Sequence, residues 1–145
     1  MPLAHLRRNC MNCVGVVILC AASSALALVP LALIAQGDEH WAAGKLDLAQ
    51  QSFQQAVAAE PLSVAAHMKL AGLQLSRLDF KACIQTYQQT ISLDGKNAKA
   101  WLGLGFAYLH TSQNQLSLAA FNEAIRIDPS TRDKLGSVLA NLSKP

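Results

Sequence analysis

The sequence is poor in charged residues. Charged side chains make up 14% of its 145 residues, whereas hydrophobic residues make up 52%. An average soluble domain contains roughly 25% charged residues. Some apolar sequence must therefore lie outside an ordinary folded core, and the surplus is found in residues 14–35, which carry no charge.

The sequence also lacks the patterns of a catalytic, metal or cofactor site. It contains no HExxH motif and no P-loop, and Gly103-x-Gly105 lacks the third glycine and the preceding strand of a dinucleotide site. His40, His67 and His110 lie far apart in the chain without paired carboxylates, which favours surface or groove-edge positions over metal ligation. We expect no enzymatic activity, no cofactor and no metal.

A disulfide framework is absent too. Cys10, Cys13 and Cys20 lie in or beside the apolar run, and only Cys83 lies elsewhere. Cys10-x2-Cys13 has no second pair, so it is interpreted as two unspecialised cysteines or as juxtamembrane acylation sites. Cys83 is interpreted as a small packing residue.

Basic charge is not concentrated in the folded part. The formal net charge is +3, but Arg7 and Arg8 precede the apolar run. From Gln36 onward, the sequence contains ten Lys and Arg residues and nine Asp and Glu residues, so the net charge of this part is +1. A nucleic-acid partner needs a basic face for phosphate, so we expect none.

The apolar run predicts a membrane anchor. As a helix, residues 14–35 would be about 33 Å long, and a hydrocarbon core is about 30 Å thick. The alternative is a cleavable signal peptide, with Arg7 and Arg8 as its basic region and Ala25-Leu26-Ala27 as a cleavage motif. The run favours the anchor because it is longer than the usual apolar region of a signal peptide and continues beyond that motif.

The flanking charges predict the orientation. Arg7 and Arg8 favour the cytoplasmic side, whereas Asp38 and Glu39 follow the run. A single-pass membrane protein with its C-terminal part in the periplasm, a lumen or the exterior is therefore expected. Pro30 either kinks the membrane helix or begins a new helix.

The remaining chain repeats itself without gaps, with a period of about 34 residues, which is the tetratricopeptide length. The aligned positions share an aromatic, a small and a helix-breaking residue: Phe53, Tyr87 and Phe121; Ala56, Thr90 and Ala124; Pro61, Gly95 and Pro129. A fixed period of this length indicates a solenoid built from one supersecondary unit.

The third copy resembles the tetratricopeptide-repeat (TPR) family. Its matching residues are Trp101, Leu104, Gly105, Tyr108, Phe121, Ala124 and Pro129, and Ser117 stands where alanine is usual. The second copy keeps Leu70, Ala71, Cys83 and Tyr87, and the first keeps Gly37, Ala49, Phe53, Ala56 and Pro61. In the first copy Gln36 and His40 replace the usual leucine and tyrosine. The resemblance implies an all-α fold, a right-handed α-solenoid of three helical hairpins.

The helix-breaking residues and the repeat period predict how the chain is divided into segments and helices. Residues 1–13 form a short basic arm, 14–35 the transmembrane anchor or signal peptide, and 30–63, 64–97 and 98–131 the three repeats. First helices are expected at about 31–43, 64–76 and 98–111, and second helices at 48–59, 80–93 and 115–127. Residues 132–145 form a capping helix and tail, with one apolar stripe of Leu135, Val138, Leu139 and Leu142.

The resemblance also implies a binding surface. In this family the first helices line a concave groove that binds a peptide or a partner helix. The groove residues predicted here are Trp41, Met68, Lys69, Leu75, Lys99, Leu102, Phe106 and Leu109. Leu102 and Phe106 are expected at the centre, with Lys99 and Lys69 favouring an acidic or carboxylate-bearing segment. Alternatively, some of these residues pack against the capping or membrane helix, or mediate self-association.

Chaperone-tail binding is not expected. Family members of that kind hold a C-terminal carboxylate with lysine, asparagine and arginine side chains. The corresponding positions here carry Ile34, Asp38, Lys69, Lys99 and Gly103, and only Lys99 matches.

The sequence thus predicts a non-catalytic protein–protein interaction module. It would be a membrane-tethered adaptor or assembly scaffold that binds a protein or peptide partner in the groove. The alternative is a periplasmic or secreted repeat module released by signal-peptide cleavage.

Overall fold

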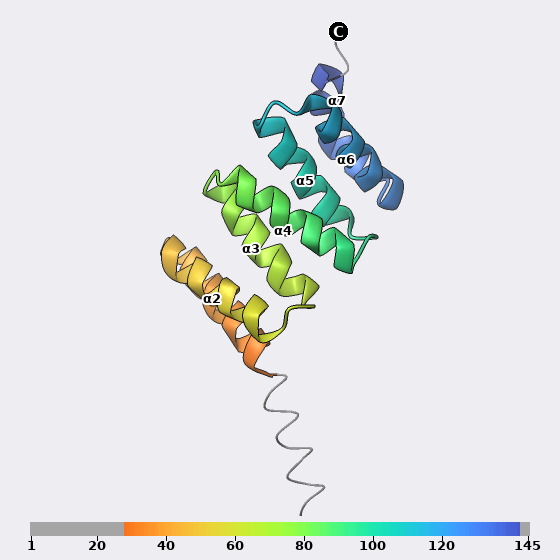
Figure 1. Ribbon diagram of the computed structural model, residues 1–145. Helices are drawn as coiled ribbons and strands as arrows, with labels where there is room; N and C mark the ends of the chain where they lie inside the picture. Colours follow the sequence, from red (N-terminus) through yellow and green to blue (C-terminus); the bar gives the residue numbers. More distant parts are fainter. Residues whose placement is uncertain (1–27, 143–145) are drawn as a thin grey trace, which may run out of the picture.

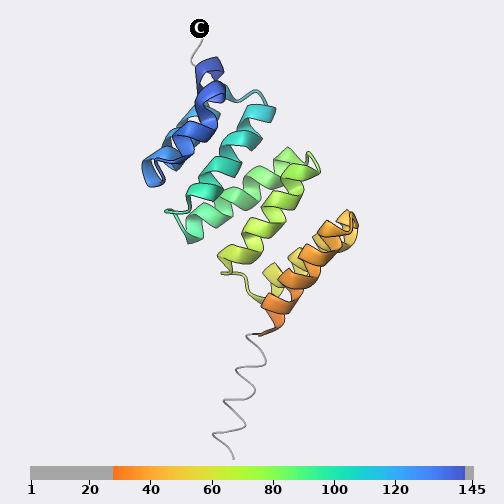
Figure 2. The same cartoon turned by 180° about the vertical axis from the view of Figure 1, so that it is seen from behind.

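The computed structural model describes residues 28–142, all of whose regular structure is helical (Figure 1). A first helix covers residues 28–42, and the following helices are α2 (Leu46–Ala59), α3 (Val64–Ser76), α4 (Phe80–Leu93), α5 (Ala98–His110), α6 (Asn114–Ile127) and α7 (Thr131–Leu142). They stack one after another from the N-terminal to the C-terminal end, as the view from behind also shows (Figure 2). The predicted all-α solenoid is confirmed.

The helix ends follow the breakers and caps in the sequence. α3 and α4 have the predicted bounds, whereas α2 and α6 begin slightly before the predicted positions. α3 begins after Ser63, whose Oγ accepts a hydrogen bond from the Ala66 amide, and α5 begins after Asn97, whose Oδ1 accepts from the Ala100 amide. Lys45 and Gln113, which precede α2 and α6, provide no such cap, so those two starts lack a local signal in the sequence.

The turns before α3, α5 and α7 have the same geometry. At equivalent positions of the repeat, the amides of Ser63, Asn97 and Thr131 donate to the carbonyl oxygen three residues earlier, at 3.0, 3.2 and 3.1 Å. α7 therefore begins where a further first helix would begin. Leu135 and Leu139 of α7 occupy the positions of Trp101 and Gly105, and they join the apolar cluster that closes this end of the solenoid.

Small residues allow the close approach of the helices, as the repeat pattern predicts. A Cβ atom added to Gly105 would lie 2.5 Å from Phe121 Cδ1, and one added to Gly37 would overlap the Phe53 ring. In the middle copy Ala71 replaces this glycine, and the aromatic Tyr87 lies instead against Gly103 of α5. Gly103 thus has a packing role that the family motif does not assign to it.

The turns inside the hairpins also repeat. Gly44, Leu78 and Ser112 lie at the same position of the three successive repeats and have φ angles of 72°, 62° and 60°. Only glycine adopts this left-handed region without steric cost. Glycine, the residue that this backbone conformation favours, thus occurs in only one of the three equivalent turns. The second turn has an exposed leucine, Leu78, at this position.

Leu78→Gly is therefore expected to stabilise the fold, by about 0.5–1 kcal/mol, because removing the Cβ relieves the backbone at little loss of packing. Thermal melts of the full chain in mild detergent measure the effect. Gly44→Leu is the reverse control and should lower the melting temperature. A Leu78→Gly protein that melts below the parent would show that this leucine contributes more than its exposure indicates.

The predicted membrane segment lies mostly outside the described residues. Its last part, residues 28–35, belongs to the helix that covers residues 28–42, in which Pro30 and Ile34 are buried. Ile34 packs with Ala56 of α2 and Ala66 of α3. No helix within residues 28–142 combines the length and the apolar character needed to cross a membrane. Within residues 30–35, which were predicted for both the anchor and the first repeat, Pro30 and Ile34 are thus buried in the solenoid, whereas Leu31 is exposed.

Candidate partner-binding surface

Large apolar side chains recur at one register of the first helices. Trp41, Leu75 and Leu109 occupy the same repeat position on the helix of residues 28–42, on α3 and on α5. Each is neither buried nor fully exposed. Equal register in a solenoid places them along one face of successive repeats. We call Trp41, Leu75 and Leu109 the apolar row.

Trp41 connects the first helix to α3. Its indole meets the Phe53 ring edge-to-face, with ring centroids 6.2 Å apart. The position of a Cβ on Gly72 would be 3.5 Å from the outer edge of the Trp41 ring, which is ordinary van der Waals contact. The Trp41 indole therefore lies against α3 at Gly72, one turn before Leu75, the next member of the row.

Lys69 is paired within the chain. Its Nζ lies 2.8 and 2.7 Å from the two carboxylate oxygens of Asp38, and both side chains are 42% exposed. Such a half-exposed pair contributes about 0–1 kcal/mol to stability, but it neutralises the charge of Lys69. Lys99 is exposed and forms no ion pair with another residue of the range 28–142. Of the two predicted groove lysines, only Lys99 presents an unpaired charge to a partner.

Leu102 and Phe106 pack at the C-terminal end of the solenoid. Both border the cluster of Phe121, Ile125 and Leu135, and the Phe106 and Phe121 rings meet edge-to-face at 5.1 Å. This cluster includes Leu135 of α7, but the ring contact of Phe106 is with α6, so the alternative that these two residues lie against the capping helix stays a prediction. Each keeps part of its surface exposed, so their role as the centre of a partner site stays a prediction.

The other predicted residues divide in the same way. Met68 and Leu75 border the central cluster that includes Ala71, Ala100 and Ala107, and both remain partly exposed. Leu109 is partly exposed near the end of α5. The eight predicted residues thus all lie on the first helices, but Trp41, Met68, Leu75, Leu102 and Phe106 also pack against the core clusters between the helices.

His67 is buried, at 8% exposure, and the prediction of a surface or groove-edge position is wrong for this residue. Its Nε2 lies 2.9 Å from the Pro61 carbonyl oxygen, and because a carbonyl oxygen only accepts, Nε2 donates. Trp101 Nε1 donates to the Gly95 carbonyl oxygen at 3.0 Å, at the equivalent positions. His67 therefore makes the structural hydrogen bond that the tryptophan of the motif makes in the third repeat. The motif alone does not predict this, because it specifies tryptophan at that position.

Cys83 is fully buried, as its interpretation as a packing residue requires. Burial, and to a lesser extent the Asp79 carboxylate, raises the pKa of the thiol to about 12. Burial also raises the pKa of the nearby Tyr87 hydroxyl. Because the thiolate is the reactive form, Cys83 is an unreactive thiol at neutral pH.

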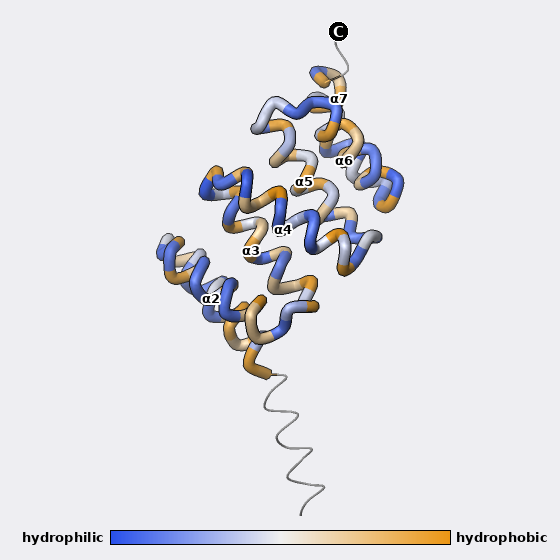
Figure 3. Tube along the Cα trace, viewed as in Figure 1, coloured by the Kyte–Doolittle hydropathy of each residue, from blue (hydrophilic) through white to orange (hydrophobic). Residues whose placement is uncertain are grey.

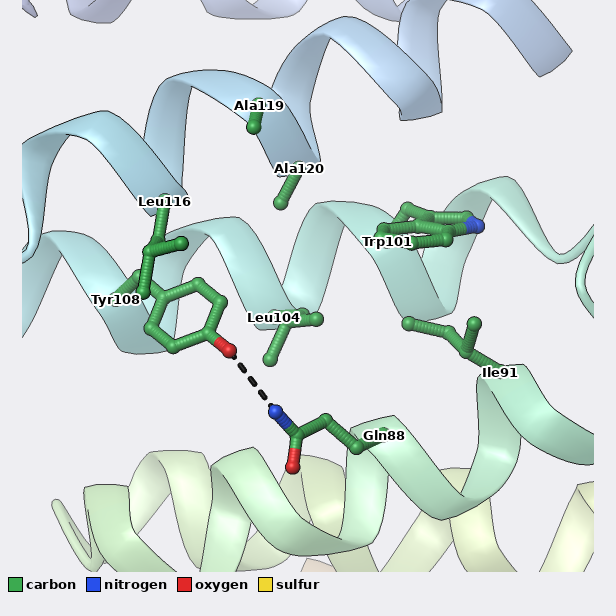
Figure 4. A pocket seen from close by; sticks show the side chains of 8 residues that line it. All are labelled: Gln88, Ile91, Trp101, Leu104, Tyr108, Leu116, Ala119 and Ala120. Carbon is green, nitrogen blue, oxygen red and sulfur yellow. Dashed lines mark hydrogen bonds between the residues drawn. The ribbon is translucent and has the colours of Figure 1, made fainter.

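A shallow apolar depression lies where α4, α5 and α6 meet (Figure 4). It measures about 290 Å³ and is lined by Gln88, Ile91, Trp101, Leu104, Tyr108, Leu116, Ala119 and Ala120. Gln88 Nε2 of α4 donates to the Tyr108 hydroxyl of α5 at 2.9 Å, in an exposed hydrogen bond between two of the lining residues. Sequence reasoning missed this depression because the repeat motif assigns Trp101, Leu104 and Tyr108 to packing.

Comparison with known proteins decides the family. The tetratricopeptide-repeat profile matches residues 34–82 and 73–130, which together cover most of the described chain. This protein belongs to the tetratricopeptide-repeat family. The TPR fold is typically a non-catalytic protein-interaction fold, and here the two matches cover the helices that carry the apolar row.

This chain matches two curated relatives over only a small part of their own length. Superkiller protein 3 of Schizosaccharomyces pombe is 35% identical over 63 residues, which is 43% of this chain and 4% of that protein. The general transcriptional corepressor trfA of Dictyostelium discoideum is 26% identical over 90 residues, 62% of this chain and 6% of that protein.

Solved TPR domains have the same fold. The first TPR domain of Spaghetti (RPAP3), bound to an HSP90 peptide, has a TM-score of 0.74 at 16% identity, over 81% of this chain and 95% of that one. The Arabidopsis OM64 TPR domain has 0.75 at 18% identity, over 80% and 98%. The N-terminal domain of stress-induced protein-1 of C. elegans has 0.72 at 19% identity, over 83% and 98%. Likeness at these identities shows the fold alone.

Proposed function

We propose that this TPR protein is a non-catalytic adaptor or assembly scaffold whose three repeats bind an apolar segment of a partner protein along their first helices. The apolar row carries the proposal. Trp41, Leu75 and Leu109 keep one register over three first helices and all remain partly exposed. Packing between neighbours alone does not require large apolar side chains to reach solvent at each of these positions.

The charges around the row favour an amphipathic helix over a carboxylate-terminated peptide. Asp38 neutralises Lys69, and Ile34 and Gly103 offer no positive charge. One solved relative holds an HSP90 peptide, but of the carboxylate-binding set expected for chaperone-tail binding this chain keeps only Lys99. An amphipathic helix needs apolar anchors on one face only, which the apolar row matches.

The proposal includes a membrane tether. The sequence before the described helix is uncharged from Val14 onward, and Arg7 and Arg8 precede it. These features support a single-pass anchor with the repeats on the non-cytoplasmic side. The alternative remains a module released after cleavage near Ala27.

Leu75→Ala/Leu109→Ala is expected to reduce partner recovery about tenfold or more, because interface energy concentrates in a few large anchors. The measurement is crosslinking and recovery of the partner from carbonate-washed native membranes that contain the full chain. The anchor keeps the chain in the pellet during the wash, whereas a released module appears in the supernatant.

Leu48→Ala/Leu116→Ala is the matched control, because these leucines are exposed on the second helices α2 and α6. Circular dichroism should show both double variants folded. Full recovery with the first variant, or a loss with the control alone, would move the site to the second helices.

A further inference from the structure

Exposed large apolar side chains gather at one end of the first hairpin. Leu28, Val29 and Leu31, at the start of the first described helix, are 61%, 47% and 63% exposed, and Leu62, in the turn before α3, is 75% exposed. The start of this helix is strongly hydrophobic in Figure 3. Because Ile34 packs with Ala66 of α3, the two segments converge at this end.

The repeat pattern shows that the apolar character of these exposed positions is specific to the N-terminal half. In the register of the repeats Leu28 and Leu62 correspond to Lys96 and Ser130, and all four are exposed. Similarly, Leu31 and Ala65 correspond to Lys99 and Asp133. The same solvent-facing positions thus change from apolar to basic, and then to polar or acidic, with distance from the N-terminal end.

These residues share one edge of the solenoid. They all lie at or just before the N-terminal ends of first helices, namely the helix of residues 28–42, α3 and α5, and these ends lie toward the lower right in Figure 1. We call Leu28, Val29, Leu31, Leu62, Lys96 and Lys99 the N-terminal edge. The acidic residues of the same turns are Glu60, which is exposed, and Asp94, whose Oδ1 accepts from the Lys96 amide.

We propose that the N-terminal edge rests on the surface of a lipid bilayer, with its apolar side chains at the headgroup boundary and Lys96 and Lys99 on anionic headgroups. This inference deepens the proposed tether and rests on it. Apolar side chains beside basic ones are the composition of an interfacial contact. The direction of the chain supports lipid over a protein partner, because the uncharged sequence from Val14 enters the described structure at this edge.

The contact would fix the orientation of the repeats relative to the membrane. The first helices would stand on the bilayer by their N-terminal ends, so the apolar row, whose members lie toward the C-terminal ends, would face away from the lipid. A tether alone would leave the solenoid free to tumble.

The test places an environment-sensitive fluorophore at Leu62→Cys in the full chain. Cys10→Ser, Cys13→Ser and Cys20→Ser remove every other cysteine except Cys83, which is buried. The chain is reconstituted into phosphatidylcholine vesicles with and without phosphatidylglycerol. We expect blue-shifted emission that lipid-borne spin labels quench. Leu78→Cys is the control, because Leu78 is also an exposed turn leucine but follows the opposite end of α3, and its probe should remain unquenched.

Lys96→Glu/Lys99→Glu tests the basic part of the edge. It should weaken quenching at position 62 in vesicles with phosphatidylglycerol, with a loss of roughly fivefold in surface partition per lysine, and change little in phosphatidylcholine alone. Vesicle flotation separates the two proposals. A chain that floats while positions 62 and 78 behave alike keeps the tether and overturns the edge contact, and a chain that fails to float overturns both.

Discussion

Gly105→Ala is expected to lower the free energy of unfolding by about 1–3 kcal/mol, although alanine is the better helix former. The added Cβ would lie 2.5 Å from the Phe121 ring. Phe121 is fully buried and packs against Phe106, so the ring cannot move aside without opening the α5–α6 contact. Thermal and denaturant melts of the full chain in mild detergent measure the change.

Gly136→Ala is the matched control. Gly136 also lies inside a helix, α7, but a Cβ there would meet no atom within 4 Å. The substitution should stabilise the protein by up to about 1 kcal/mol through helix propensity. A shift of the same sign at both positions would contradict the close α5–α6 packing around Gly105.

Ala124→Leu is expected to unfold the third hairpin locally, at a cost of about 1–3 kcal/mol or more. Ala124 is fully buried in α6, and Thr90, its equivalent in the preceding repeat, is also fully buried. The larger leucine side chain has no space there. The measurement is hydrogen–deuterium exchange resolved along the chain, with early exchange expected in α5 to α7.

Asn122→Leu is the control for this substitution, because Asn122 is exposed on the same helix. It adds apolar volume toward solvent and should leave the exchange pattern unchanged. Equal exchange in the two variants would mean that the assigned register of α6 is wrong.

The sequence predicts the helices well because the residues that end them are local signals. Pro61, Gly95 and Pro129 recur in register, and the aromatic and small positions fix the packing faces. These local signals suffice for the correct bounds of α3 and α4. They do not reveal that His67 takes the place of the motif tryptophan. Its hydrogen bond is to the Pro61 carbonyl oxygen in the preceding turn, and a backbone oxygen leaves no signal in the sequence.

The surface was harder to predict than the fold. Leu102 and Phe106 have the spacing of a groove face, but their packing beside the cluster of Phe121, Ile125 and Leu135 depends on how the last helices dock, and no periodicity contains that information. Lys69 has the charge of a groove lysine, yet Asp38 belongs to the preceding repeat and neutralises it only once the helices are stacked. Residues 30–35 have the composition of a membrane segment, and only their packing against α2 and α3 reveals a second role.

The contacts between helices run almost entirely between neighbours in the chain, from α2 to α7, with one addition between α3 and α5. The stability of each repeat therefore depends on its own packing and on its nearest neighbours, so heat or denaturant can unfold an end repeat while the middle repeat stays folded. Trp41 on Gly72, the Asp38–Lys69 pair and the packing of Ile34 with Ala66 are among the contacts that attach the first unit to the second. A ligand that contacts all three first helices would link repeats that otherwise contact only their neighbours. Unfolding of the bound protein would then become a single cooperative transition.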